Sequence, residues 1–388
     1  MSVNQIELGQ LIKPAKLIRA ENKSFPILSM TMHAGLVDQA DKFKKRVAST
    51  DTAPYKVVRR NQLVVGFPID EGVLSFQQLH DEAIVSPAYD VWDIRDERKI
   101  GTKYLERFLR SPRALAFYAS KLRGTTARRR TLPDDIFLSL LVPVPPLAEQ
   151  RRIAEVLDRA EALRAKRHAA LAQLDILIES IFFDLFGDPI QNPRGFPVKP
   201  MIDLVDPERP ISYGILMPGP DQDEGVKYVR VVDMKDGAIE LSGIRKTTEK
   251  ISNEFRRSLL KPADLLMSIR GHVGRFAVVP PELDRANITQ DTARLAIRGA
   301  SSIFVRECLR TVGFQRWMAK HTKGVAVRGI NLGDVKLMPV IVPPQKDQDD
   351  FAGRASAIEK LKGIHHASLA KLDSLFAVLQ HRAFRGEL

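Results

Sequence analysis

The sequence lacks the features of a small secreted domain and of a membrane protein. It contains a single cysteine among 388 residues, Cys308, which excludes a disulfide framework and a cysteine-rich zinc site. No apolar run approaches the ~18 residues of a membrane span. The first ten residues, MSVNQIELGQ, lack the charged and then apolar pattern of a signal peptide. The sequence therefore predicts a protein of the reducing cytoplasm that makes no use of a membrane.

Acidic residues are in deficit. The chain has 60 Lys and Arg residues against 47 Asp and Glu residues, which gives a formal net charge of +13. Such an excess favours a polyanionic partner, usually nucleic acid, although a basic protein without a nucleic-acid role remains an alternative. Hydrophobic residues make up 44% of the chain, enough for sizeable cores, and the length suits two or more domains.

Catalytic motifs are also missing from the sequence. There is no G-x-x-x-x-G-K-[ST] phosphate loop, and GHVGR at Gly271 is not followed by the helix pattern of a dinucleotide loop. NPRGFP at Asn192 is only superficially similar to the Asn-Pro-Pro-aromatic motif of adenine methyltransferases, because its third residue is arginine. A linker turn is the better interpretation of this stretch. His365 and His366 lie in a predicted helix without a metal-ligand set. We therefore expect no intrinsic enzyme activity, with an enzyme that uses an unrecognised site as the alternative.

The chain contains one long internal repeat. The stretch LLVPVPPLAEQRRIAEVLDRAEALRAKR begins at Leu140, and LMPVIVPPQKDQDDFAGRASAIEKLKG begins at Leu337. Aligning the two proline pairs gives an offset of 198 (343 − 145), and Gln150 then coincides with Gln348. Offsets of 200 to 202 align residues further upstream, including Phe117 with Trp317, Gly124 with Gly324, Arg128 with Arg328, Asp134 with Asp334 and Gly35 with Gly237. A period of about 200 residues is too long for a solenoid repeat and indicates a tandem duplication.

Each half of the duplication has a mixed pattern, with short strands first and helices later. The run from Val226 predicts a strand, a turn at Asp236 and Gly237, and a second strand. The run from Asp264 predicts two strands around 271–274, and the run from Ser302 has helical spacing. Both halves are therefore predicted to be α+β.

A long amphipathic helix is predicted after each proline pair. Glycine and proline are absent from Leu147 to Phe186, where apolar residues recur every three or four positions, and the second copy repeats this pattern from Phe351 to Leu379. Such a helix is ~60 Å long at ~1.5 Å per residue. A globular half of about 140 residues cannot cover that length, so we expect the two helices to pack as an antiparallel pair. For either helix alone, an ordinary core helix is the alternative.

These stretches resemble a known family. The two proline-glutamine helix starts, with LFGDP and HRAFRGEL beyond them, look like the helical regions of type I restriction–modification specificity subunits. ISYGILMPGPDQDEGVKYVRVVDMKDGAI, LLKPADLLMSIRGHVGRFAVVP and ANITQDTARL look like the target-recognition domains of that family. The resemblance covers nearly the whole chain. It departs from the family pattern at Asp347, where the first copy has glutamate, and it is weaker in the first recognition domain.

The resemblance implies an α+β fold with two tandem-duplicated globular target-recognition domains, separated by two long antiparallel coiled-coil helices with pseudo-two-fold symmetry. The implied boundaries are 1–140 and 190–338 for the recognition domains, and 141–189 and 339–388 for the helix regions. Each domain would bind half of a bipartite, asymmetric site in double-stranded DNA. The helices would set the spacer and dock methyltransferase subunits, usually two, through which the restriction translocase joins. S-adenosylmethionine, ATP and Mg²⁺ are then expected only on those partners. A scaffold that tethers enzymes without reading DNA is the alternative.

Basic loops are the candidate DNA contacts. KLRGTTARRR contains no acid, and KHTKGVAVR is its equivalent in the second half. Both contain a glycine that could let the backbone approach a phosphate. An alternative for Arg128 and Arg328 is pairing with acids where domain meets helix. The candidate residues are Lys121, Arg123, Arg128, Arg129 and Arg130 in the first loop, Arg270, His272 and Arg275 near a strand turn, and Lys320, Lys323 and Arg328 in the second loop.

Overall fold

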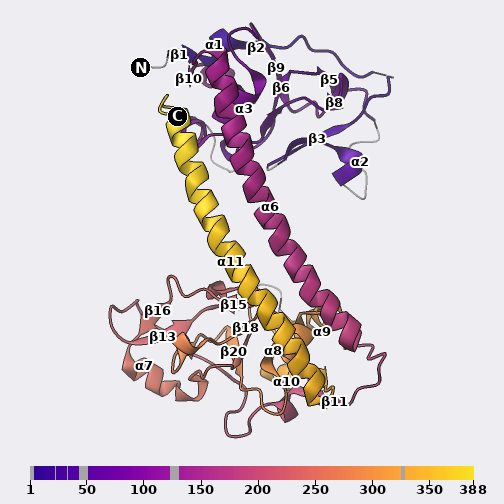
Figure 1. Cartoon of the computed structure of the whole chain (residues 1–388), viewed down its shortest axis with the longest axis vertical. Coiled ribbons are helices and arrows are strands. Elements are labelled where there is room, and N and C mark those ends of the chain that lie inside the picture. The colour runs from indigo at the N-terminus through magenta and orange to yellow at the C-terminus, as the bar shows by residue number, and fades with distance from the viewer. Residues whose placement is uncertain (1–3, 22, 33, 43–50, 123–130, 325–327) are drawn as a thin grey trace. The chain divides into compact units, whose positions relative to one another are not determined.

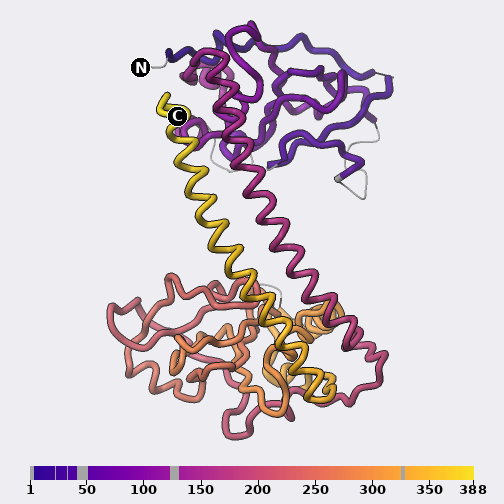
Figure 2. Tube along the Cα trace, viewed as in Figure 1, coloured from indigo at the N-terminus to yellow at the C-terminus, as the bar shows by residue number. Residues whose placement is uncertain are grey.

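The computed structural model describes residues 4–21, 23–32, 34–42, 51–122, 131–324 and 328–388. The chain forms two compact units. Unit 1 comprises Met1–His168 together with Ala367–Leu388, and unit 2 comprises Ala169–His366. Helix α6 (Leu147–Phe186) begins in unit 1 and ends in unit 2, and helix α11 (Gln345–Ala383) does the reverse. Figure 1 labels the elements, and Figure 2 traces the backbone through them.

Unit 1 is built on a four-stranded antiparallel sheet of order β2-β9-β6-β7. Two consecutive helices, α3 (Thr102–Leu109) and α4 (Pro112–Lys121), pack against this sheet. Its strands are β1 (Gln5–Glu7), β2 (Ile12–Pro14), β3 (Leu28–Thr31), β4 (Gly35–Asp38), β5 (Lys56–Arg59), β6 (Leu63–Val65), β7 (Leu74–Phe76), β8 (Glu82–Val85), β9 (Asp90–Ile94) and β10 (Leu141–Pro143). Its helices besides α6 and α11 are α1 (Leu8–Leu11), α2 (Gln39–Lys42), α3 (Thr102–Leu109), α4 (Pro112–Lys121), α5 (Asp134–Leu138) and the 3₁₀ turn η1 (Ile69–Glu71).

Unit 2 repeats this plan with a sheet of order β12-β20-β17-β18 and an added three-stranded sheet, β16-β13-β19. Its strands are β11 (Val198–Pro200), β12 (Ser212–Tyr213), β13 (Val226–Val229), β14 (Met234–Lys235), β15 (Ala238–Ile239), β16 (Arg245–Thr247), β17 (Leu265–Ser268), β18 (Phe276–Val278), β19 (Asn287–Ile288), β20 (Thr292–Leu295) and β21 (Pro339–Ile341). Its helices are η3 (Met201–Leu204), η4 (Val231–Asp233), α7 (Glu249–Glu254), η5 (Arg256–Ser258), η6 (Pro281–Leu283), α8 (Ser302–Arg310), α9 (Val312–His321) and α10 (Leu332–Lys336).

The predicted duplication is confirmed by the topology. Strands β6 and β7 pair antiparallel in unit 1 as β17 and β18 do in unit 2, each strand starting 202 residues earlier than its counterpart (265 − 63; 276 − 74). The first strand of each unit pairs antiparallel with the strand just before the long helix, β1 with β10 and β11 with β21. The helix pairs α3–α4 and α8–α9 also correspond. Ser111 and Thr311 occupy the same break and cap the second helix through their hydroxyl oxygens.

One predicted hairpin is wrong in its extent. The run from Val226 does not form two long strands around Gly237, because η4 interrupts it. Asp233 accepts a bond from the Arg230 amide at 2.8 Å and pairs with the Arg230 guanidinium at 2.6 Å, which turns the chain out of the sheet. Strand β13 therefore pairs with β16 and β19, and only the two-residue strands β14 and β15 flank the glycine.

The repeated glutamine holds each long helix to its own domain. The Gln150 side chain accepts a hydrogen bond from the Gly101 amide at 2.9 Å and donates to the Lys99 and Pro145 carbonyls at 2.8 Å. Gln348 accepts from the Ser301 amide at 3.0 Å and donates to the Pro343 carbonyl at 2.8 Å. Both glutamines are 1% exposed, so each buried amide satisfies backbone groups at the joint between domain and helix.

The α6 and α11 segments run antiparallel within each unit. In unit 1, Arg164 pairs with Asp373, and Arg152 donates to the Leu388 carbonyl. In unit 2, Lys362 pairs with Asp175. The predicted apolar stripe is not buried along its whole length, however. Four of its leucines are between 42% and 51% exposed: Leu163, Leu177, Leu361 and Leu375.

Aromatic side chains join the long helices to each domain. In unit 2, Phe304 of α8 stacks on Phe182 at 5.7 Å and meets Phe186 edge-on at 4.9 Å, and Phe351 of α11 lies 5.5 Å from Phe182. In unit 1, Phe384 meets Tyr104 at 5.8 Å and Phe108 at 5.2 Å, and it is the 198-residue counterpart of Phe186 (384 − 186). Each domain core therefore continues directly into the helices, and the buried aromatic rings supply large apolar surfaces at this joint.

The single cysteine lies inside the unit 2 core. Cys308 is fully buried on α8, and burial raises the pKa of its thiol far above the usual range. Across the described part of the chain, no helix is long and apolar enough to cross a membrane.

Candidate nucleic-acid interface

Two of the predicted basic loops come together in unit 2. The Gly271 amide donates to the Arg328 carbonyl at 2.9 Å, and Ile330 donates to the Ile269 carbonyl at 2.9 Å. Lys323 pairs in turn with Gly329 through two backbone bonds of 2.8 and 2.9 Å. Gly271 and Arg328 are 57 residues apart in sequence (328 − 271), and their bond brings the β17–β18 turn and the segment after α9 together in one surface.

The β17–β18 turn is held from below by a buried serine. Ser268 is fully buried, and its hydroxyl accepts a bond from the Arg275 amide at 2.8 Å while it donates to the His272 carbonyl. Gly271 and Gly274 have φ angles of +70° and +89°, which glycine adopts without strain. The turn therefore presents its basic side chains outward from a fixed backbone.

The basic side chains on this surface are exposed. Among the described residues, no acid forms an ion pair with them, so the alternative in which Arg328 pairs with an acid near the helix finds no support there. Arg270 donates to Gln290 Oε1 at 3.1 Å, which fixes its direction. Exposed cations without acidic partners are suited to a polyanion. The residues are Arg270, His272, Arg275, Lys320, Lys323 and Arg328.

Two hollows lie on either side of Gln315. One, of about 620 Å³, is lined by the β14–β15 turn together with Arg275 and Arg310. The other, of about 470 Å³, is lined by Gly271, Thr322 and Arg328. Gln315 donates to the Gly274 carbonyl at 3.2 Å and to the Leu309 carbonyl at 3.0 Å, so it forms the wall between them.

An apolar loop beside this surface was not predicted as part of the interface. Tyr213, Leu216 and Met217 are 52%, 53% and 76% exposed. The loop adjoins the basic surface because the Gln290 amide donates to the Ile215 carbonyl at 2.8 Å and the Gln290 side chain holds Arg270. Exposed apolar side chains next to cations occur in proteins that wedge into DNA grooves. These residues lie in the stretch ISYGILM, which looks like a buried strand in the sequence because it is an apolar run.

The corresponding surface of unit 1 differs. Lys121 is exposed in the last turn of α4, and Arg123, Arg128, Arg129 and Arg130 lie outside the described residues. The turn between β6 and β7 is equivalent to the β17–β18 turn, but it carries Asp70 and Glu71 in place of basic residues. Its exposed apolar residue is Phe67, at 55%. The two units therefore present different chemistry at matching positions.

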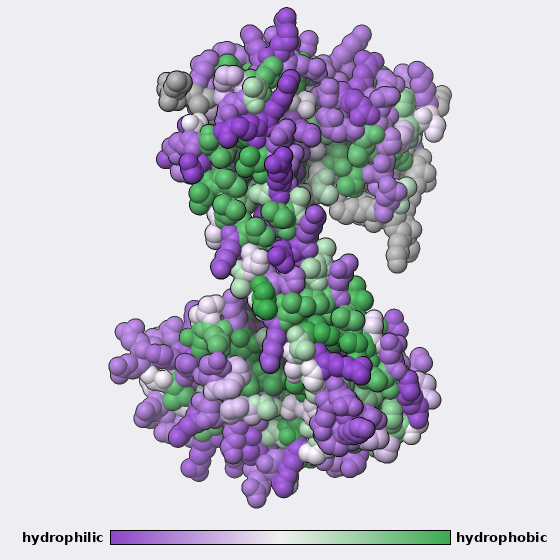
Figure 3. Space-filling view, viewed as in Figure 1, coloured by the Kyte–Doolittle hydropathy of each residue, from purple (hydrophilic) through white to green (hydrophobic). Residues whose placement is uncertain are grey.

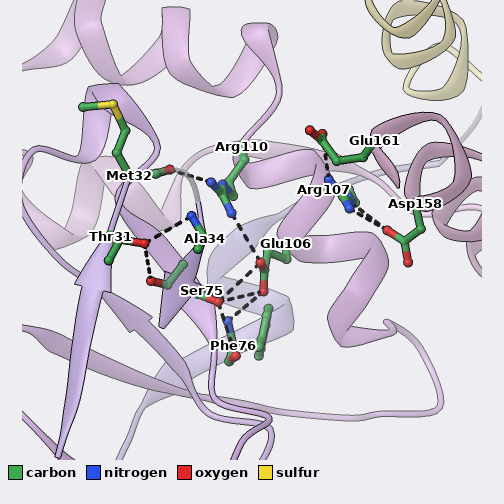
Figure 4. A network of polar contacts seen from close by, with 11 residues as sticks. Thr31, Met32, Ala34, Ser75, Phe76, Glu106, Arg107, Arg110, Asp158 and Glu161 are labelled. Carbon is green, nitrogen blue, oxygen red and sulfur yellow. Dashed lines mark hydrogen bonds and ion pairs between the residues drawn. The ribbon is translucent and has the colours of Figure 1, made fainter. Parts of the chain in front are cut away.

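Unit 1 also contains a largely buried acid on α3 (Figure 4). Glu106 accepts a bond from the Phe76 amide at 2.8 Å and lies 3.7 Å from Arg110, which in turn donates to the Met32 carbonyl. Burial raises the pKa of Glu106 above its usual 4.5, an effect that the Phe76 amide and Arg110 only partly offset.

Glu106 should make unit 1 less stable as the pH rises. The folded state binds the proton more tightly than the unfolded state, so its contribution is greatest below pH 4.5 and is lost as the pH rises through the folded pKa. Glu106→Gln should therefore flatten the fall in melting temperature between pH 4.5 and neutrality. Trp92 fluorescence in a Trp317→Phe background reports unit 1. The exposed Glu155→Gln is the matched control, and identical pH profiles for Glu106→Gln and the wild type would contradict the assignment.

In the described ranges, no group of three or more His, Cys, Asp or Glu side chains is arranged to hold a metal ion.

Comparison with known proteins finds relatives of one kind. No protein-family model matches the chain. The EcoBI type I restriction enzyme specificity subunit of Escherichia coli is 29% identical over 327 residues, which are 74% of this chain and 66% of that protein. The EcoKI specificity subunit of Escherichia coli strain K12 is 24% identical over 332 residues, 76% of this chain and 67% of that one. This chain is similar to type I restriction specificity subunits. The match spans about two thirds of the length of these relatives.

Solved structures agree on the fold. The S subunit of the type I restriction–modification system from M. genitalium has a TM-score of 0.56 at 13% identity, over 98% of this chain and 96% of that one. A chain from a study of complex assembly and conformational transition of the type I R-M system has a TM-score of 0.52 at 17% identity, over 100% and 98%. The predicted α+β fold with duplicated domains and long helices is therefore that of S subunits.

Proposed function

We propose that this chain is the DNA sequence-specificity subunit of a type I restriction–modification complex. The observation that carries the proposal is the duplicated fold with unlike turns at matching positions, basic in unit 2 and acidic in unit 1. Two readers of the same fold but different surfaces suit a bipartite, asymmetric site in double-stranded DNA. The similarity to the EcoBI and EcoKI specificity subunits supports the same assignment.

Each recognition domain, 1–140 and 190–338, would bind one half-site. In the second domain, the surface of Arg270, Arg275 and Arg328 provides cations for phosphates and base edges. The apolar loop at Leu216 and Met217 provides a contact within a groove. In the first domain, Lys121 and the arginines at 123 and 128–130 would contact DNA.

The helix regions, 141–189 and 339–388, would set the unread spacer and dock methyltransferase subunits. The exposed leucines of the long helices support docking, because they fall into two pairs at the 198-residue offset. Leu163 is the counterpart of Leu361 (361 − 163), and Leu177 is the counterpart of Leu375 (375 − 177). Figure 3 shows hydrophobic surface over the α6 segment of unit 2. Two matched apolar patches suit two identical partners.

The chain itself would be non-catalytic and would act in the cytoplasm. S-adenosylmethionine, ATP and Mg²⁺ would be held by the methyltransferase and translocase subunits, and the translocase would join through the methyltransferases.

Mapping methylated bases tests the proposal. A cell that expresses this chain with its methyltransferase should carry a bipartite methylated motif. Exchanging residues 190–338 for those of a relative should change one half of the motif, and exchanging 1–140 should change the other. A motif unchanged by both exchanges would reject DNA reading and favour the scaffold alternative.

A further inference from the structure

The ion pair between the long helices occurs once in each unit, at equivalent positions. In unit 1, Arg164 of α6 donates from Nε to Asp373 of α11 at 2.6 Å. In unit 2, Lys362 of α11 donates from Nζ to Asp175 of α6 at 2.7 Å. The offset of 198 relates cation to cation (362 − 164) and acid to acid (373 − 175). Each helix thus carries the cation in one unit and the acid in the other.

Both pairs continue into the recognition domains through an equivalent glutamate. In unit 1, Glu161 lies 3.2 Å from Arg164 and 3.5 Å from Arg107 of α3 (Figure 4 shows the Arg107 contacts). In unit 2, Glu359 lies 3.4 Å from Lys362 and 3.4 Å from Arg306 of α8. In each unit, a line of four alternating charges therefore runs from the domain helix to the long helix that carries the glutamate, and from there to the other long helix. We call this line the charge ladder.

The cations of the unit 2 ladder are more deeply buried than those of unit 1, whereas its acids Glu359 and Asp175 are 25% and 45% exposed. The side chains of Arg306 and Lys362 are 7% and 3% exposed, whereas those of Arg107 and Arg164 are 28% and 25% exposed. A buried ion pair contributes little net stability, because desolvation offsets the attraction, and its best-attested use is to fix register. Lys362 is buried at the position where the other copy of the repeat has Arg164. We therefore expect this ion pair to fix the geometry of the helices more than to add stability.

A slip in the register of α6 against α11 would be larger than one base-pair step of DNA. Apolar contacts between helices are non-directional, and a slip of one helical turn moves a helix by ~5.4 Å. That exceeds the ~3.4 Å rise of one base pair. Charged pairs with fixed partners penalise such a slip.

We infer that the two charge ladders are positioning devices that lock the register of the helix pair and the angle of each recognition domain on it, and thereby the spacer length. The inference rests on the proposed function. Glu161 and Glu359 are the central positioning residues, because each one touches both its domain helix and the cation that crosses to the other long helix.

The test measures spacer discrimination by the assembled complex of full-length chain and methyltransferase. Methyl transfer is followed on duplexes with both half-sites intact and spacers of the native length, one base pair shorter and one longer. Glu359→Gln should reduce the preference for the native spacer by about fivefold to tenfold, the coupling expected within one charge network. Lys362→Arg should retain the preference, since unit 1 uses arginine there.

Two controls separate geometry from folding. Asp350→Asn removes an exposed acid elsewhere on α11 and should leave discrimination unchanged. Glu161→Gln changes the more exposed ladder, where the glutamate is 43% exposed, so it provides a second variant if Glu359→Gln unfolds. It should also relax the spacer.

The outcomes are distinct. Wild-type spacer preference in both glutamine variants overturns the inference, and so does an equal loss of rate on all three spacers, which indicates a purely structural role. Absence of any bipartite preference in the wild-type complex instead rejects the proposed function.

Discussion

Replacing Phe351 by alanine should lower the free energy of unfolding of unit 2 by about 3–5 kcal/mol, the usual cost of deleting a fully buried phenylalanine. Phe351 is 0% exposed and lies within 6.5 Å of Phe182, Phe186 and Phe304, so the cavity would open between α6, α8 and α11. Trp317 fluorescence in a Trp92→Phe background follows the urea unfolding of this unit, because the chain has one tryptophan in each unit.

The matched control is Leu337→Ala. Leu337 lies in the same unit but is 67% exposed, so its truncation should change the stability by less than about 0.5 kcal/mol. Equal effects of the two substitutions would mean that the aromatic cluster does not join the helices to the domain.

Seven residues inserted after His168 and seven after His366 should change the spacer and leave both half-sites unaltered. The two histidines are equivalent at the 198-residue offset (366 − 168), so both helices lengthen at the same point of the repeat. Seven residues add ~10 Å of helix, about three base pairs of DNA. The measurement is the methylated motif in cells that express the variant with its methyltransferase.

The same seven residues inserted after Gly243, in an exposed turn of unit 2, should leave the spacer unchanged. If the helix variant altered the half-site bases and kept the DNA spacer constant, α6 and α11 would not be the elements that set the spacer.

The repeat made most of the fold predictable. Gln150 and Gln348, each five residues after the first proline of a pair, located both helix starts, and the structure shows why the glutamine recurs. The exposed leucines were not predicted, because Leu163 and Leu177 fit the apolar periodicity as well as the buried Leu157 does. Their exposure depends on how the two helices face each other, which periodicity does not specify.

The arrangement of the candidate interface was predicted only in part, and its contact with DNA stays a prediction. Arg270 and Arg328 were selected for their charge, but spacing gave no sign that backbone bonds at Gly271 and Ile330 would place them on one surface. Met217 was missed because an apolar side chain in an apolar run looks like core. In unit 2, the interruption at Asp233 was hidden, because capping depends on a side chain that folds back on Arg230.

Cys308 has a practical consequence. A thiol that is fully buried and whose pKa is raised by burial supplies almost no thiolate near neutral pH, so it should not react with maleimide probes in the folded protein. A pair of cysteines engineered at exposed sites, one in each unit, would then take up spin labels or fluorophores without background from the native residue. The distance between two such labels would report the separation of the two units in solution, before and after DNA is added.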